Sequence, residues 1–280
     1  MKLIGIDLDG TLLNSDSKIN KENIEALKSI ANEDGYYVYI CSGRPQDNIK
    51  ELLDKYDLDL PRVGSNGGVA YEGDKMLFEF PFSREAALKV YEVIKDYPYL
   101  TYNRMGRFGE TDHLEKLEHL FNIAKDVLTQ SELKSFDNYK NGLKFHEFTD
   151  FYKMLDDKNL QILKFFMYMP IDEIKKTIQS KLVGKKGINC TESESINIEI
   201  VPDHVNKGKV FEHLEKYLNL ENSTRIAIGD SLNDLEMFEM ADYSFAMENA
   251  HPDIKELADY QVASNDNHGV AEAIEIIKKI

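Results

Sequence analysis

The 280-residue sequence predicts an α/β protein with a parallel sheet, interrupted by an inserted α+β unit. Its length fits about two domains. Short apolar runs alternate with helical patterns in the first third of the chain, and the same alternation returns in the last third. The apolar runs are nearly continuous, which is typical of parallel strands covered on both faces. The middle lacks strict alternation, so we expect a core of residues 1–82 and 190–280 and an inserted cap of residues 83–189.

The first third supplies the first two strand–helix pairs. An apolar run at residues 3–6 predicts a strand, and Ile24, Leu27 and Ala31 follow at helical spacing. A second apolar run at residues 36–41 predicts the next strand. Ile49, Leu52 and Leu53 indicate another helix.

The last third and the middle are assigned in the same way. In the last third, we expect helices at 207–217, 232–240, 252–258 and 270–279 and strands at 225–228, 243–246 and 260–263. In the middle, we expect helices at 85–96, 114–125 and 171–183, a hairpin at 100–104 and 107–110, and strands at 160–169, 188–191 and 196–201. Residues 129–159 are polar and receive no assignment.

Composition limits the partners. With 34 basic and 50 acidic side chains, the formal net charge is −16. Nucleic acids and anionic membrane surfaces select clustered Lys and Arg, so neither is expected as a partner. An acidic protein that handles phosphates needs local positive charge, and we expect a metal ion to supply it.

The cysteines and the apolar segments indicate a cytoplasmic location. Cys41 and Cys190 are too few for a disulfide framework, and Cys41 reads as a buried thiol. The chain opens with a carboxylate already at position 7, unlike a signal peptide, and no run approaches the ~18 apolar residues of a membrane span. We therefore expect reducing cytosol.

The first chemical motif is Asp7-Leu8-Asp9-Gly10-Thr11, directly after the first expected strand. Two carboxylates this close stay ionised only beside a cation; otherwise one takes a proton. The motif therefore fits a metal site or a nucleophile beside a general acid. A solvated turn is the alternative.

Three further motifs carry polar groups that suit phosphate or metal. Ser42-Gly43-Arg44 ends the second strand, where a hydroxyl and free amides can hold a phosphate oxygen, although an ordinary turn reads the same. Lys207 is placed at a helix start, against the macrodipole, where it could balance an anion or simply be solvated. Gly229 to Asp234 brings Asp230 and Asp234 to a helix start, which suits hard-cation ligation or N-capping by Ser231 or Asn233.

The four motifs point to one site when taken together. Three of them follow strands expected to be parallel, and ligands bind at the carboxyl ends of such strands. In type, order and spacing they resemble the four motifs of the haloacid dehalogenase-like (HAD) superfamily, closest to its Cof-type hydrolase branch. Asn66-Gly67-Gly68 and the stretch from Asn249-Ala250 to Gly269-Val270 also resemble that branch. The resemblance covers both core segments and reaches the cap only by position and length.

The resemblance implies a Rossmann-like core, a mobile α/β cap that selects the substrate, and Mg²⁺. It makes Asp7 the nucleophile that forms an aspartyl-phosphate, and Asp9 the general acid that later activates water. It implies that Asp7, Asp9 (through its backbone carbonyl), Asp230 and Asp234 serve the metal. The phosphate is expected to meet residues from all four motifs and the Asn66 turn, namely Thr11, Ser42, Gly43, Arg44, Asn66, Lys207 and Asn233. Arg44 reads equally well as the partner of a carboxylate.

The expected function is hydrolysis of small phosphorylated metabolites, with sugar phosphates as the leading class. Asp9 favours hydrolysis, since dehalogenases of the superfamily lack this second Asp and P-type ATPases carry Thr there. A phosphosugar mutase or phosphotransferase is the nearest alternative, and a non-enzymatic phosphate-binding module is another. No obligatory protein partner is implied.

Overall fold

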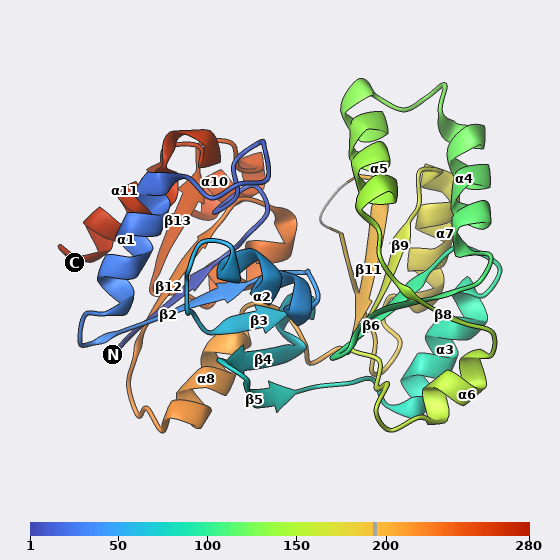
Figure 1. Cartoon of the computed structure of the whole chain (residues 1–280), viewed down its shortest axis with the longest axis horizontal. Helices are drawn as coiled ribbons and strands as arrows, with labels where there is room; N and C mark the ends of the chain where they lie inside the picture. The colour runs from blue at the N-terminus through green and yellow to red at the C-terminus, as the bar shows by residue number, and fades with distance from the viewer. Residues whose placement is uncertain (193–194) are drawn as a thin grey trace. The chain divides into compact units, whose positions relative to one another are not determined.

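The computed structural model describes residues 1–192 and 195–280. The chain forms two compact units, one of residues 1–79 and 205–280 and the other of residues 80–204. Each unit has its own sheet (Figure 1). The expected α/β class with an inserted α+β unit is confirmed.

The larger unit contains an eight-stranded sheet in the order β14-β13-β12-β1-β2-β3-β4-β5. Pairing is parallel from β14 to β3, and β4 and β5 add an antiparallel edge. The strands are β1 (Lys2–Ile6), β2 (Tyr36–Cys41), β3 (Arg62–Gly64), β4 (Val69–Glu72), β5 (Lys75–Glu79), β12 (Thr224–Gly229), β13 (Tyr243–Met247) and β14 (Tyr260–Val262).

Helices cover this sheet and shield its apolar strands from water. They are α1 (Lys21–Ala31), α2 (Gln46–Asp54), α8 (Val210–Leu218), α9 (Leu235–Glu239), α10 (Pro252–Leu257) and α11 (Gly269–Ile277), with short 3₁₀ turns η1 (Ser65–Gly67), η2 (Leu232–Asp234) and η3 (Asn265–Asn267). Helices α1 and α11 lie side by side (Figure 1), and the Ala271 amide donates to Asn23 Oδ1 at 3.0 Å. Leu3, Ile4 and Ile6 of β1 are fully buried, as expected for a central strand.

The smaller unit contains a six-stranded sheet in the order β10-β11-β9-β6-β7-β8, antiparallel except for the β7–β8 pair. Its strands are β6 (Leu100–Asn103), β7 (Gly106–Glu110), β8 (His146–Phe148), β9 (Lys164–Tyr168), β10 (Asn189–Thr191) and β11 (Asn197–Val201). Its helices are α3 (Arg84–Ile94), α4 (His113–Ala124), α5 (Gln130–Gly142), α6 (Phe151–Asp156) and α7 (Asp172–Leu182).

Alternation along β9 explains how this sheet is covered. Phe165 and Met167 pack with α3, α6 and α7 in one apolar cluster. Phe166 and Tyr168 pack with α4 and α5 in a second cluster. The sheet of this unit therefore lies between two layers of helices.

The boundaries of the inserted unit differ from those expected at residues 83 and 189. Strand β11 pairs with β9, so residues 190–204 belong to the smaller unit and not to the core. At the other end, Phe82 packs edge-on against Phe165, with 5.4 Å between ring centroids. An apolar run predicts a strand but not the strand with which it pairs. The expected core therefore wrongly included residues 190–204.

Two local expectations also change. Lys207 does not open a helix, because α8 begins at Val210 and Lys207 lies in the turn before it. The unassigned residues 129–159 form α5, β8 and α6, and α5 begins with a capping box between Thr129 and Glu132.

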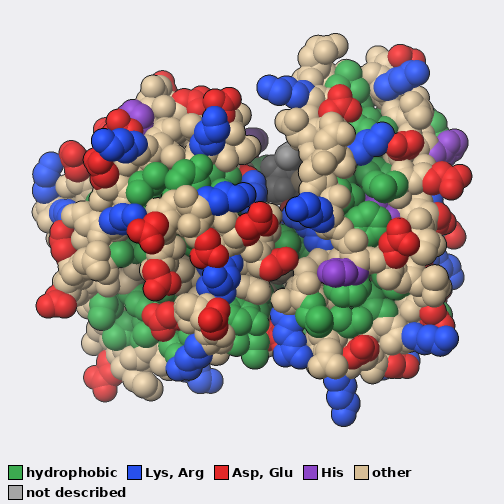
Figure 2. Space-filling model, viewed as in Figure 1, with side chains coloured by type: hydrophobic (Ala, Val, Ile, Leu, Met, Phe, Trp, Pro, Cys, Tyr) green, Lys and Arg blue, Asp and Glu red, His purple; other side chains and the backbone are tan. Residues whose placement is uncertain are grey.

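Three expectations from the composition concern the charged surface, membrane-spanning segments and the cysteines. On the face shown in Figure 2, Lys and Arg side chains lie among Asp and Glu. Within the described ranges, no helix is long and apolar enough to cross a membrane. Cys41 is a buried free thiol, as expected.

Candidate active site

The site lies where the central strands of the larger unit end. Asp7 follows β1, Ser42 follows β2 and Asp230 follows β12, and these three strands are parallel neighbours. Their carboxyl ends therefore meet at one edge of the sheet. The turn before α8 brings Lys207 to the same place, since its ammonium binds the Asp7 carboxylate.

Lys207 is the centre of a buried ionic cluster. Its Nζ donates to Asp7 Oδ1 at 2.5 Å, to Asp234 Oδ1 at 2.6 Å and to Asn233 Oδ1 at 2.9 Å. The Lys207 and Asp234 side chains are 0% exposed and that of Asp7 is 5% exposed. Three acceptors match the three N–H donors of an ammonium group, so the cation is fully satisfied without water.

Asp234 is held from both sides. Its Oδ1 accepts from Lys207, and its Oδ2 accepts from the backbone amides of Asp230 and Ser231 at 3.0 and 3.1 Å. Both carboxylate oxygens are thus engaged by the protein. Asp234 orients Lys207 and the turn after β12, and the N-capping by Ser231 considered from the sequence is part of the same turn.

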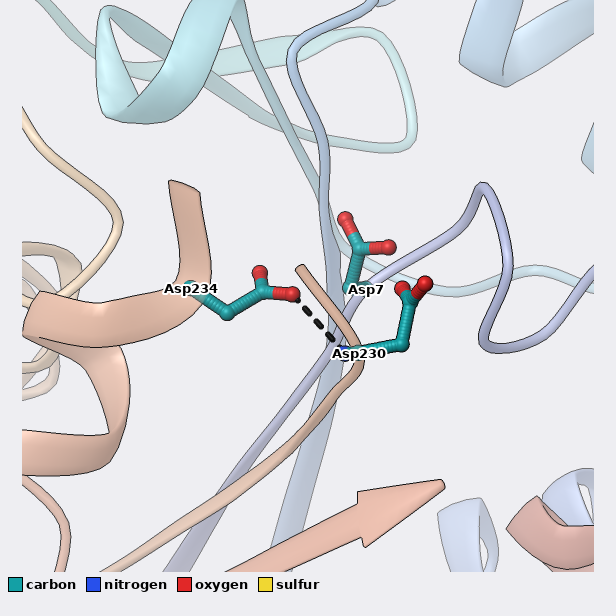
Figure 3. Close-up of side chains that lie close together, drawn as sticks. All are labelled: Asp7, Asp230 and Asp234. Atoms are coloured by element: carbon teal, nitrogen blue, oxygen red, sulfur yellow. Dashed lines mark hydrogen bonds between the residues drawn. The ribbon is translucent and has the colours of Figure 1, made fainter. Parts of the chain in front are cut away.

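Figure 3 shows Asp7, Asp230 and Asp234 gathered around one point, from the end of β1 and from the turn after β12. Each offers a carboxylate oxygen, and these oxygens lie within 4.8 Å of one another. Three carboxylates against the single ammonium of Lys207 leave two negative charges in a buried place. One divalent cation balances that charge, and an all-oxygen donor set suits Mg²⁺.

The pKa shifts of the cluster have the same origin. Burial raises the pKa of Asp230 to about 7, with a further contribution from the Asp234 charge. Burial also raises the pKa of Asp7, and Asp234 adds to the rise while Lys207 opposes it. Burial lowers the pKa of Lys207, but the carboxylates of Asp234 and Asp7 outweigh it and the net pKa is raised. The crowded carboxylates therefore favour a bound cation.

The turn after Asp7 is shaped by Gly10 and Thr11. Gly10 has φ +82°, and a Cβ there would lie 2.3 Å from Asp230 Oδ2. Thr11 donates its hydroxyl hydrogen to Asp230 Oδ1 at 2.9 Å and is fully buried. Thr11 thus contacts a carboxylate of the cluster, and its expected contact with phosphate stays a prediction.

The Ser42 loop lies against a left-handed turn. Ser42 is 2% exposed, and its Oγ accepts from the Arg44 amide at 3.2 Å; Gly43 lies between them. The Asn66 amide donates to the Ser42 carbonyl at 3.0 Å, and Asn66 has φ +59°. The structure therefore joins the Asn66 turn to the Ser42 loop, and both were expected to contact phosphate.

Arg44 and Asp9 form an ion pair at the edge of the site. Arg44 Nε donates to Asp9 Oδ2 at 2.8 Å, and Nη2 donates to Asp9 Oδ1 at 2.5 Å. Of the two interpretations of Arg44, pairing with a carboxylate is present in the structure. Asp9 is the most open carboxylate of its motif, with a side chain 55% exposed.

Two asparagines hold the loop after Asp9 and had no assigned role. Asn249 Nδ2 donates to the Gly10 carbonyl at 2.8 Å, and Asn265 Nδ2 donates to the Leu13 carbonyl at 2.8 Å. The Asn265 amide in turn donates to Asn249 Oδ1 at 2.9 Å. The stretch from residue 249 to 270 was singled out because it resembles the family. That resemblance did not indicate what Asn249 and Asn265 contact.

The comparisons with known proteins agree with this geometry. The family model described as haloacid dehalogenase-like hydrolase matches residues 4–274. The chain therefore belongs to that family, and the expected resemblance is confirmed.

Among its relatives are named phosphatases, which place the chain in the phosphatase class. The 5-amino-6-(5-phospho-D-ribitylamino)uracil phosphatase YwtE of Bacillus subtilis (strain 168) is 34% identical over 98% of this chain and 97% of its own length. The Escherichia coli (strain K12) protein of the same activity, YbjI, is 25% identical over 100% of this chain and 97% of its own length. A solved haloacid dehalogenase-like hydrolase from B. subtilis superposes with a TM-score of 0.83 at 25% identity, covering 98% of this chain and 99% of that one.

Proposed function

We propose that this phosphatase hydrolyses phosphate monoesters of small polyhydroxylated metabolites, with Mg²⁺ and through an aspartyl-phosphate on Asp7. The buried cluster of three carboxylates and one lysine carries the proposal. A phosphate ester repels an incoming carboxylate, so the site must supply positive charge. Lys207 contributes one such charge, and the remaining two negative charges of the cluster fit a divalent ion.

Asp7 and Asp230 are the side chains proposed to hold Mg²⁺, together with the backbone carbonyl of Asp9. Asp234 is better placed as their support, because hydrogen-bond donors already occupy both of its oxygens. When bound, the ion would neutralise charge on the phosphoryl oxygens. Thr11, which donates to Asp230, would keep that carboxylate in a fixed orientation.

The proposed reaction has two steps. A carboxylate oxygen of Asp7 attacks phosphorus, the bond to the ester oxygen breaks, and Asp9 gives its proton to the departing oxygen. Asp9 then takes a proton from water as that water attacks the aspartyl-phosphate, which releases phosphate and restores Asp7. Lys207 holds Asp7 by its Oδ1 and stabilises the charge that develops. The Ser42 hydroxyl and Gly43 are the proposed contacts of the phosphoryl oxygens, with Asn66 and Asn233 beside them.

The names of the relatives support the proposed substrate class. Three relatives, each matched over nearly its full length, carry the name of a phosphatase for a phosphorylated ribitylaminouracil, whose phosphate is on a sugar-alcohol chain. This supports phosphorylated polyols and sugars as substrates of this chain. The inserted unit is proposed to select among them.

The test is phosphate release from a panel that contains this ribitylaminouracil phosphate, several sugar phosphates and an aryl phosphate, with Mg²⁺ or with chelator. We expect Mg²⁺-dependent release, and loss of at least about 10³-fold in Asp7→Asn. Asp47→Asn, an exposed carboxylate of α2, is the matched control and keeps activity. Isomerised sugar phosphate without free phosphate would instead establish a mutase.

A further inference from the structure

Arg44 donates hydrogen bonds to both carboxylate oxygens of Asp9, in a forked arrangement. The two bonds, from Nε to Oδ2 and from Nη2 to Oδ1, are 2.8 and 2.5 Å. Such a planar fork fixes the direction of a carboxylate as well as its position. The Asp9 side chain is 55% exposed, and the two bonds of the fork restrict its rotation.

Arg44 is itself held at three points. Its Nη1 donates to Asn48 Oδ1 of α2 at 3.0 Å, and its amide donates to Ser42 Oγ at 3.2 Å. Its carbonyl accepts from the Ser65 amide at 2.9 Å. These contacts fix the Arg44 backbone and one end of the guanidinium that binds Asp9.

The turn that contacts the Arg44 backbone contains strained residues. Ser65 and Asn66 have φ of +53° and +59°, followed by Gly67 at +101°. Left-handed conformations at non-glycine residues cost free energy, and they persist where surrounding contacts determine them. The amides of this turn donate to the carbonyls of Arg44 and Ser42. These two hydrogen bonds therefore fix the position of the loop that carries Arg44.

We propose that Arg44 is a positioning residue for Asp9, and that it determines how well the enzyme handles esters with poor leaving groups. This inference rests on the proposed function. In its first step one oxygen of Asp9 carries a proton in place of one bond of the fork, and Arg44 keeps its bond to the other oxygen. That proton passes to the ester oxygen as the phosphorus–oxygen bond breaks and the bond from Asp7 forms. An alkoxide needs that proton, whereas a nitrophenolate departs readily without it. Misdirecting Asp9 therefore penalises alkyl esters selectively. A residue that only bound the phosphoryl group would affect both ester classes alike.

The experiment compares kcat and KM for p-nitrophenyl phosphate and for an alkyl phosphate such as glycerol phosphate. The variants are Arg44→Gln and the conservative Arg44→Lys. Arg225 is the matched control, because it forms the same forked pair with Glu215, at 2.8 and 2.7 Å, away from the site. Arg225→Gln and Arg225→Lys thus report the effect of losing a forked ion pair as such.

We expect Arg44→Gln to lose at least about tenfold more kcat for the alkyl ester than for the aryl ester. Arg44→Lys, with one point of contact, should recover part of the loss. Adding Arg44→Gln to Asp9→Asn should have little further effect on the alkyl ester, because both changes remove the same step. Neither Arg225 variant should discriminate between the esters.

Other outcomes overturn the inference in identifiable ways. Equal losses for both esters, with a rise in KM, would make Arg44 a phosphate ligand, and unchanged kinetics would make the ion pair merely structural. If Arg44→Gln fails to fold, Arg44→Lys decides by the same ratio of the two esters. Wild-type protein that releases phosphate from neither ester nor the wider panel would overturn the proposed function itself.

Discussion

Lys207 and Asp234 form an ion pair with no solvent exposure, 2.6 Å between Nζ and Oδ1, across 27 positions of sequence. Asp234→Ala would leave Lys207 with Asp7 as its remaining buried carboxylate partner. Asp234→Ala would also leave the amides of Asp230 and Ser231 without their acceptor. The ion pair of Lys207 and Asp234 therefore contributes both to the stability of the fold and to the proposed chemistry of the site.

We expect Asp234→Ala to lower the free energy of unfolding by about 1–3 kcal/mol, because the amides of Asp230 and Ser231 lose their acceptor while Lys207 keeps Asp7. Denaturant unfolding measures the change. Lys50→Ala is the control, because its pair with Asp54 is exposed and contributes about 0–1 kcal/mol. A loss for Asp234→Ala no larger than for Lys50→Ala would contradict the buried arrangement.

Gly10→Ala should reduce activity through Asp230. The added Cβ would lie 2.3 Å from Asp230 Oδ2, so that carboxylate must move. Gly35→Ala separates this contact from backbone strain, because Gly35 has φ +94° and nothing within 4 Å of its Cβ position. We expect both variants to lose about 1 kcal/mol of stability from the positive φ, and only Gly10→Ala to lose phosphatase activity. Equal activity in both would contradict the role of Asp230.

Mg²⁺ should raise the melting temperature of the wild-type protein. A ligand that binds only the folded state stabilises it by about 2.7 kcal/mol at a concentration of 100 times its Kd. Asp230→Asn removes one proposed ligand charge, so its melting temperature should respond much less. Matched ionic strength in KCl controls for screening. The same Mg²⁺ response in both proteins would place the ion elsewhere.

Acid should destabilise the smaller unit through His113. Burial lowers the pKa of His113 to about 4 from its usual 6.5, and Asp112 and the Tyr99 backbone oppose the shift. Between those two pH values the unfolded chain binds a proton that the folded chain does not, so stability falls as pH drops from 6.5 to 4. The loss has an upper limit of about 3 kcal/mol, from the 1.36 kcal/mol that each pH unit represents.

His113→Phe is the test of that dependence. The ring packs edge-on near Phe145, 5.4 Å between centroids, so an apolar ring of similar size is suited to the position. Unfolding measured from pH 7 to pH 4 should show a shallower decline in the variant than in the wild type. Parallel curves for the two proteins would show that other groups are responsible.

The sequence predicted most of the core and of the site because both depend on local pattern. The apolar runs at β1 and β2 and the polar residues that follow them are adjacent in sequence, and parallel topology brings their ends together. Partners distant in sequence were not predictable. The fork from Arg44 to Asp9 spans 35 positions, and nothing in the residue types chose it over a contact with substrate.

The inserted unit shows the same limit. Its helices and strands were mostly recognised, but α5 was not, because only Phe136 of that helix is buried and its apolar periodicity is weak. Its boundary also moved, since the place of β11 depends on pairing with β9 rather than on its own sequence. Lys207 was expected in a helix because of the pattern that follows it, whereas the turn before α8 gives its ammonium access to Asp7.

The loop after Asp9 is fastened by Asn249 and Asn265, and Asp7 itself is held by a lysine 200 positions further along. During synthesis, the proposed nucleophile therefore leaves the ribosome long before the groups that orient it. The intervening unit of residues 80–204, which has its own sheet, is made in between. A growing chain therefore contains Asp7 before the residues that hold it exist, and the site can assemble only after nearly the whole core has been made.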